Sequence, residues 1–466
     1  MSIGIPLTNF TRTGAPFIGT ARSQRRWLRL AQLLIIGYSS MGRSFAYIGI
    51  APAKMFIGEL ALGWFILRKF RTIDWAVFRL PKSRPIELLR IAFLTFLLYG
   101  AVMIGYGIFE GRPILGVLLN SGFNYYALYL VMGLWLGYTQ PESLPRTIRA
   151  LAWIHGIYGV AYVVYLNQAA VPLPWAGGVD MFGQPGASAT AIIGLLAFQP
   201  RIGRALIPIL LNVFVLIGMQ VRSEWAAFIG AFTVWSILSQ KMKQFAAVVA
   251  VGAVLTAAGL IYDIRLPGPS GRGGEISVQG VIGRAIAPFI PGEADKYVED
   301  ADSLGGTWSW RKNWWREIWK AVNDSSEREF FFGFGYGYPI ADLAGYVEEL
   351  VRTPHNIFFY VLCYGGWVGV AVFALFQGSI CWCMWQVYKR TGQAFGVAFW
   401  LINICMALLG NSLENPFGAI PFFLISGMAI ACLVKPAPVH GFPVIMPQGS
   451  EPPLARAGSG YAWTGG

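Results

Sequence analysis

One histidine lies where a catalytic base could act, at the junction between a long polar segment and an apolar run. The motif is Arg352-Thr-Pro-His355-Asn356, and the apolar run behind it carries the pair Gly365-Gly366. A histidine can take up a proton near neutral pH. Asn356 could cap or orient the turn, and Arg352 and Asn356 are candidate supporting residues. A histidine at a membrane surface that only caps a helix fits the spacing equally well.

A basic and aromatic segment precedes this motif by about forty residues. It reads Arg311-Lys-Asn-Trp-Trp315 and is followed by Trp319. A helix would place Arg311, Trp315 and Trp319 on one face, because they are four residues apart. The face could hold a charged contact beside aromatic platforms for a sugar or lipid. It could equally belong to an amphipathic helix at the membrane surface, with its tryptophans among the headgroups. Arg316 is a rival of Arg311 for the charged role.

One acidic residue near the end of the chain could support the histidine. Glu414 follows an apolar run, in the segment Asn411-Ser-Leu-Glu-Asn-Pro416. It could pair with an arginine or orient His355. An ion pair that only stabilises the fold is at least as good an interpretation, because acidic groups near a membrane need partners.

The elements that position these residues are membrane helices. The chain has 466 residues, of which 55% are hydrophobic and only 13% are charged, about half the charged fraction of an ordinary soluble domain. The net charge is +13, but the basic residues form short clusters between apolar runs. That distribution is typical of cytoplasmic loops and argues against nucleic-acid binding. All five cysteines lie in or beside the late apolar runs, which indicates packing rather than disulfides.

We predict about twelve transmembrane helices, since a span needs about 20 apolar residues. With the N-terminus in the cytoplasm, every basic cluster falls on the cytoplasmic side. The predicted spans are 29–47, 52–69, 87–108, 119–138, 150–167, 186–199, 205–220, 224–239, 244–262, 356–387, 394–411 and 418–434.

This topology divides the chain into five parts. Residues 1–28 form a cytoplasmic tail, and residues 29–262 hold the first nine spans. Residues 263–355 form a large, mainly helical periplasmic loop with 14 of the 23 acidic residues. Residues 356–434 hold three more spans, and residues 435–466 form a disordered cytoplasmic tail. The fold class is therefore all-α and polytopic.

Taken in order, the motifs resemble the O-antigen ligase/polymerase family. His355-Asn356 with the glycines after it looks like the family hallmark. Upstream, Arg311-Lys-Asn-Trp-Trp315 and the glycine-rich Gly333-Phe-Gly-Tyr-Gly337 are similar to the family's Arg-and-Trp helix and turn. Arg222 matches an arginine that opens a family membrane helix, although Val221 replaces the usual serine before it. The resemblance covers about residues 201–434.

The resemblance implies a membrane glycosyltransferase of the GT-C type in the bacterial inner membrane, with its active site facing the periplasm. Such an enzyme moves an oligosaccharide from undecaprenyl diphosphate to an acceptor sugar hydroxyl, with inversion and without metal or cofactor. The implied roles are base or acceptor-orienting group for His355 and diphosphate contacts for Arg222 and Arg311. Arginine suits a diphosphate leaving group because its donors are fixed and bidentate.

Three functions stay open on the sequence. A polymerase would join lipid-linked repeat units into surface polysaccharide, and we favour this function. A ligase would pass the finished glycan to lipid A core. A polysaccharide flippase is the alternative of another class, but the chain shows no evident inverted repeat, and its Arg and His residues gather at one face of the membrane.

Overall fold

The computed structural model describes residues 21–50, 55–69, 83–167, 181, 186–199, 202–269, 275–287, 290, 301–345, 353–410 and 412–434. Helices make up most of these residues. The predicted C-terminal tail from 435 and most of the predicted N-terminal tail, residues 1–20, lie outside the described residues, and so does Arg352.

The first part of the chain is a series of helices with one short β-hairpin. The hairpin is antiparallel, with Gly49 opposite Phe56. The elements are α1 (Ala21–Met41), α2 (Arg43–Ala46), β1 (Gly49–Ile50), β2 (Met55–Phe56), α3 (Ile57–Lys69), α4 (Arg84–Phe109), α5 (Ile114–Asn120), α6 (Gly122–Tyr125), η3 (Tyr126–Leu128), α7 (Tyr129–Thr139), α8 (Ser143–Ala161), η4 (Tyr162–Leu166), α10 (Ala187–Phe198), α11 (Ile202–Gly218), α12 (Arg222–Leu238) and α13 (Met242–Ile261).

The second part holds the predicted 263–355 loop and three further helices. The loop is mainly helical where it is described, as predicted, but it opens with an antiparallel hairpin that we did not predict. The elements are β3 (Arg265–Pro267), β4 (Glu275–Ser277), α14 (Val278–Ile286), α16 (Ala301–Asn323), α17 (Glu327–Phe332), η7 (Ile340–Ala344), α18 (Ile357–Thr391), α19 (Phe395–Leu409), α20 (Pro416–Ile430) and η8 (Ala431–Leu433).

This is a helical membrane protein. Within the described residues, five helices are long and apolar enough to span a bilayer, namely α4, α8 with η4, α13, α18 and α20 with η8. The bent pair formed by α5 and the α6–α7 run, with an angle of 48°, would make a sixth. Each of the twelve predicted spans overlaps a helix, but α10, α11 and α19 are shorter than a full span. The count of twelve is not confirmed.

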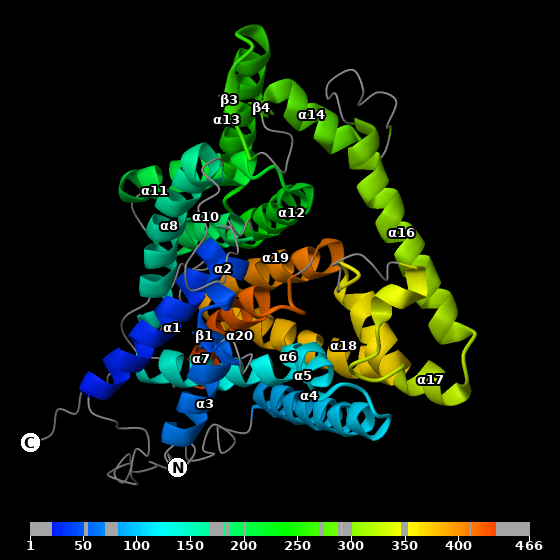
Figure 1. Cartoon of the computed structure of the whole chain (residues 1–466). Helices are drawn as coiled ribbons and strands as arrows, with labels where there is room; N and C mark the ends of the chain where they lie inside the picture. Colours follow the sequence, from blue (N-terminus) through cyan, green and yellow to red (C-terminus); the bar gives the residue numbers. More distant parts are fainter. Residues whose placement is uncertain are drawn as a thin grey trace, which may run out of the picture.

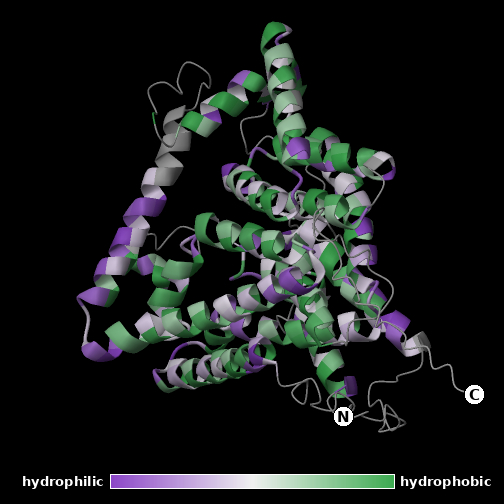
Figure 2. Cartoon of the chain, turned by 180° about the vertical axis from the view of Figure 1, so that it is seen from behind, coloured by the Kyte–Doolittle hydropathy of each residue, from purple (hydrophilic) through white to green (hydrophobic). Residues whose placement is uncertain are grey.

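The tightest packing joins helices that are far apart in sequence. α7 lies along α20, α4 along α18, and α12 along α19. α7 and α20 approach closely because Gly133 faces Leu424 and Gly427 faces Leu130, a small-residue contact that suits helix packing in lipid. The outer faces of α4, α11 and α13 carry many exposed large apolar side chains, and these helices are predominantly hydrophobic in Figure 2.

A glycine-rich turn after α17 docks against a break in α18. Gly366 has φ 58° and interrupts the helix, a conformation that only glycine adopts readily. At this break the Cys363 carbonyl accepts from the Phe334 amide at 2.8 Å, and the Tyr364 carbonyl accepts from the Gly335 amide at 3.1 Å. A Cβ at Gly333 would lie 2.5 Å from the Gly366 nitrogen. One backbone-to-backbone contact therefore explains both the glycine-rich segment 333–337 and the Gly365-Gly366 pair.

This docking fixes the position of α16. The helix runs along one edge of the molecule, from α14 at the top to α17 at the lower right (Figure 1). It packs on α18 through two aromatic contacts, Trp315 stacked on Phe359 and Trp319 edge-on to Trp367. Trp314 is fully buried and donates to the Ile340 carbonyl at 3.2 Å. α16 is thus held by its tryptophans against the protein.

Gly366→Ala should destabilise the fold strongly. The backbone conformation of Gly366 (φ 58°, ψ −163°) alone costs about 1–3 kcal/mol for alanine, and the new methyl would lie 2.5 Å from the Gly333 nitrogen. Gly378→Ala is the matched control, because Gly378 lies in the same helix and a Cβ there meets no atom within 4 Å. Thermal unfolding of the purified protein in detergent should show a much lower unfolding temperature for Gly366→Ala and an unchanged one for Gly378→Ala. Equal unfolding temperatures would contradict the docking.

Candidate active site

His355 lies in a strained turn directly before α18. Its φ is 52°, one of four positive values at non-glycine residues in the described chain. The helix cap is Asn356, whose Oδ1 accepts from the amides of Phe358 at 2.9 Å and Phe359 at 3.4 Å. Capping therefore does not account for His355. Strained residues of this kind concentrate at functional sites.

Arg311 of α16 lies beside His355. Its charge acts on the imidazole, and its Nη1 donates to the Leu409 carbonyl at the end of α19, at 3.1 Å. The guanidinium forms no ion pair, and its buried Nε has no hydrogen-bond partner among the described residues. A partly buried cation without a counter-charge among the described residues is unfavourable, so this position is suited to an anionic ligand.

Arg222, at the start of α12, also lies near the end of α19 and near Arg311. It opens α12, and its charge acts on Arg311. The next residue, Ser223, lies near Gly410, the residue that follows α19. Arg222 and Arg311 therefore both surround the end of α19, although 89 positions separate them in the chain. The start of a helix also favours negative charge through its free amides and its dipole.

The electrostatics keep the histidine neutral and the arginines charged. Burial, with help from the Arg311 charge, lowers the pKa of His355 to about 4. Burial and the neighbouring Arg222 lower the pKa of Arg311, but an arginine pKa is so high that the group stays protonated. Near neutral pH the site thus combines a neutral imidazole, able to accept a proton, with two adjacent cations.

Sequence reasoning missed a third arginine. Arg284 of α14 is buried, with 6% of its surface exposed, and its backbone carbonyl lies 3.5 Å from the Arg222 Nη1. Its signal in the sequence was a lone cation in the otherwise uncharged segment 278–286. α14 therefore contacts Arg222 through the backbone carbonyl of Arg284.

The remaining predicted residues are placed differently. Trp315 donates its indole N–H to the Pro354 carbonyl at 2.7 Å, so it contacts the turn that carries His355. Arg316, the rival of Arg311, is exposed and pairs with Glu317 at 3.4 Å. Trp319 is half exposed and packs on Trp367.

Glu414 is buried in the turn between α19 and α20, with 5% of its surface exposed. Its Oε2 accepts from the Ser412 amide at 3.1 Å, and its Oε1 has no partner among the described residues. Burial raises the pKa of Glu414 to about 8, so the carboxyl is mostly neutral at pH 7. Within the described chain it bonds neither to His355 nor to an arginine, in contrast to both roles that we had expected.

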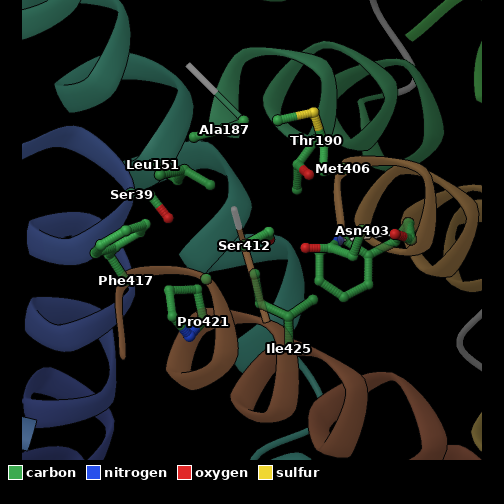
Figure 3. Close-up of a pocket in the computed structure, with 13 residues that line it drawn as sticks. Ser39, Leu151, Ala187, Thr190, Asn403, Met406, Ser412, Phe417, Pro421 and Ile425 are labelled. Carbon is green, nitrogen blue, oxygen red and sulfur yellow. Dashed lines mark hydrogen bonds between the residues drawn. The ribbon is translucent and has the colours of Figure 1, made fainter. Parts of the chain in front are cut away.

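A small polar pocket lies on another side of α19. Ser39, Thr190, Asn403 and Ser412 bring hydroxyl and amide groups to it from α1, α10, α19 and the turn before α20 (Figure 3). Phe417 and other apolar side chains complete the lining. None of the lining residues is charged, so the pocket is poorly suited to a diphosphate, and the arginines remain the candidate anion site.

Comparison with known families adds independent information. Residues 207–374 match the family model described as O-antigen ligase. The chain carries an O-antigen ligase domain. The resemblance inferred from the motifs is thereby confirmed, and the family places the protein among glycosyltransferase-like membrane enzymes. A search of the curated proteins finds no match.

The O-antigen ligase domain is shorter than the segment over which we inferred the resemblance. It ends within α18 at residue 374 rather than at about 434, so it leaves out α19, Glu414 and α20. It includes Arg222, Arg284, Arg311 and His355. The arginines and the histidine thus belong to the domain, whereas the end of α19 that Arg311 contacts lies outside it.

Glu414→Gln should remove a pH-dependent loss of stability. The folded pKa of about 8 is higher than the ordinary 4.5, so ionisation favours the unfolded chain as pH rises between these values, and stability falls across that window. We expect the wild-type unfolding temperature to drop between pH 5 and 8 by on the order of 5 °C more than that of the variant. The exposed Glu142 supplies the control Glu142→Gln. Parallel pH curves for wild type and Glu414→Gln would contradict the buried neutral acid.

Proposed function

We propose that this protein transfers a glycan from a polyprenyl diphosphate carrier, of the undecaprenyl type, to an acceptor sugar hydroxyl on the periplasmic side of the bacterial inner membrane. The observation that carries the proposal is the meeting of Arg222, Arg311 and His355, all three from the O-antigen ligase domain, near the end of α19. No metal or cofactor takes part in the proposed reaction.

The chemistry follows from the charges at the site. The acceptor oxygen attacks the anomeric carbon from the side opposite the leaving group, and the new C–O bond forms with inversion. The bond between that carbon and the carrier diphosphate breaks, and the leaving diphosphate takes the bonding electrons. Arg222 and Arg311 stabilise the charge that develops on its oxygens. His355 takes the proton of the acceptor hydroxyl.

The topology that supports this reaction is the one predicted from the basic clusters. In the proposed arrangement the helices form about twelve spans of the GT-C type, and the shorter α10, α11 and α19 cross together with neighbouring helices. The segment 263–355 then lies outside the cytoplasm, where α16 reaches over the ends of α12, α18 and α19. The polyprenyl tail stays in lipid, beside the apolar outer faces of the helices.

We favour a surface-polysaccharide polymerase, in which both donor and acceptor are carried on lipid. The second candidate is an O-antigen ligase that uses lipid A core as acceptor, and the description of the matched family favours it. The two reactions share one donor site, so the arginines and His355 serve either. They differ in the intermediate that accumulates when the site is disabled.

His355→Asn and Arg311→Gln should abolish transfer without loss of the folded protein. Asparagine tolerates positive φ, so the first change removes the base at little backbone cost. Arg316→Gln on the same helix is the control for Arg311, because Arg316 is exposed and pairs with Glu317. Glycan length and lipid-linked intermediates in cells provide the measurement. Single units retained on the carrier indicate a polymerase, and full-length chains stranded there indicate a ligase. Wild-type profiles from both variants would refute the assignment.

The transfer rate should be insensitive to pH through the range in which histidines ordinarily titrate. Because the His355 pKa is about 4, the imidazole stays unprotonated above about pH 5 and serves as a base there. In proteoliposomes supplied with lipid-linked donor, the rate should be flat from pH 6 to 8 and fall only on acidification toward 4. A loss of rate centred near pH 6.5 would show instead that His355 is hydrated and far from Arg311.

A further inference from the structure

We propose that Trp315 is a positioning residue that latches the His355 turn onto α16, so that one helix both holds the donor and presents the base. The inference rests on the proposed function and deepens it. The juxtaposition that carries it is the hydrogen bond from the Trp315 indole to the carbonyl of Pro354, the residue before His355, at 2.7 Å.

The latch has two parts. The indole N–H donates to the turn, and the ring lies flat on Phe359 of α18, with centroids 5.5 Å apart and planes 11° apart. Pro354 is buried, so its carbonyl would lose a partner without the indole, at a cost of about 1–3 kcal/mol. Trp315 therefore contacts both the residue before the base and the first turn of the helix after it.

The hydrogen bond from Trp315 restrains the positive-φ backbone at His355. A positive φ is uncommon for residues that carry a Cβ, although histidine adopts it more often than most, and it is less favourable than the right-handed helical conformation. Contacts on both sides of the turn therefore help to hold this geometry. Asn356 caps α18 on one side of His355, and Trp315 binds Pro354 on the other. Together they keep the imidazole where the Arg311 charge reaches it.

Arg311 and Trp315 are one helical turn apart on α16, so the two functions move together. A displacement of α16 would shift Arg311 relative to the diphosphate and release the His355 turn at the same time. Arg311 of α16 is the described titratable group whose charge acts on His355, and the charge of Arg222 of α12 acts in turn on Arg311. A released imidazole would become hydrated and leave this positive field.

The test is Trp315→Phe, which keeps a stacking ring and removes the N–H donor. Transfer is measured in proteoliposomes with lipid-linked donor, per folded protein, over the range of pH 4 to 8. We expect kcat to fall on the order of 10- to 100-fold, as for a misplaced catalytic group. The donor KM should change by no more than about threefold, since Arg311 is intact. The acid limb of the rate should move up by about one pH unit or more as His355 becomes hydrated.

Trp319→Phe is the matched control. Trp319 lies one turn further along α16 and also packs on α18, but its indole donates no hydrogen bond within the described residues. Its variant should keep the wild-type kcat and acid limb. Phe359→Leu is a second route in case Trp315→Phe fails to fold, because it loosens the indole from the other side and should move the acid limb in the same direction.

The outcomes separate the latch from the proposed function. An upward shift of the acid limb in Trp315→Phe or Phe359→Leu, absent in Trp319→Phe, supports the latch. Transfer that is sensitive to His355→Asn, with the same pH profile in the Trp315 and Trp319 variants, overturns the latch alone. Wild-type protein without transfer activity, or an unaffected His355→Asn variant, overturns the proposed function instead.

Discussion

The candidate site depends on one backbone contact, the docking of the glycine-rich turn into the break of α18. At this contact the amides of Phe334 and Gly335 satisfy carbonyls at the break, and Gly333 and Gly366 lie too close for any side chain. The Tyr99 hydroxyl donates to the next carbonyl, that of Gly365, from α4. Three segments are thereby fixed to one another, and the direction in which α16 runs past α18 is set.

Around this contact, hydrogen bonds from tyrosine and asparagine side chains tie α5 and α6 to the same turn. Asn120 accepts from the Gly337 amide at 3.0 Å, and its own carbonyl accepts from Tyr360 at 2.7 Å. Asn124 accepts from the Tyr336 hydroxyl. Buried polar groups of this kind are expensive unless they are satisfied. Their pairing joins α5 and α6 to the glycine-rich turn and to α18.

The sequence predicted the helices better than the contacts between them. Apolar runs and basic clusters placed a helix at each predicted span, because burial in lipid depends on local composition. The motifs also selected His355, Arg222 and Arg311, which the structure brings to one place. The break at Gly366, the Trp315 contact with Pro354 and the buried Arg284 escaped prediction, because each depends on a partner that is distant in the chain.

Glu414 is a residue whose partner the sequence predicted wrongly. Its position at the end of an apolar run suggested a partner for a cation, yet the carboxyl turns back to the Ser412 amide and stays neutral through burial. Spacing can locate a charged residue near a membrane surface, but it does not reveal which way the side chain points. That direction is set by the turn between α19 and α20, and no local pattern encodes it.

In the proposed mechanism the arginines of α12 and α16 bind a lipid diphosphate without a metal ion. The most direct measurement is the shift in unfolding temperature of the purified protein when undecaprenyl diphosphate is added, compared with undecaprenyl monophosphate, both in the presence of a chelator. Binding to the folded state raises the unfolding temperature. We expect a concentration-dependent rise in unfolding temperature that is larger for the diphosphate, persists in the chelator and disappears when Arg222 and Arg311 are both replaced by glutamine. Equal responses to the two lipids, or a response unchanged by those replacements, would contradict it.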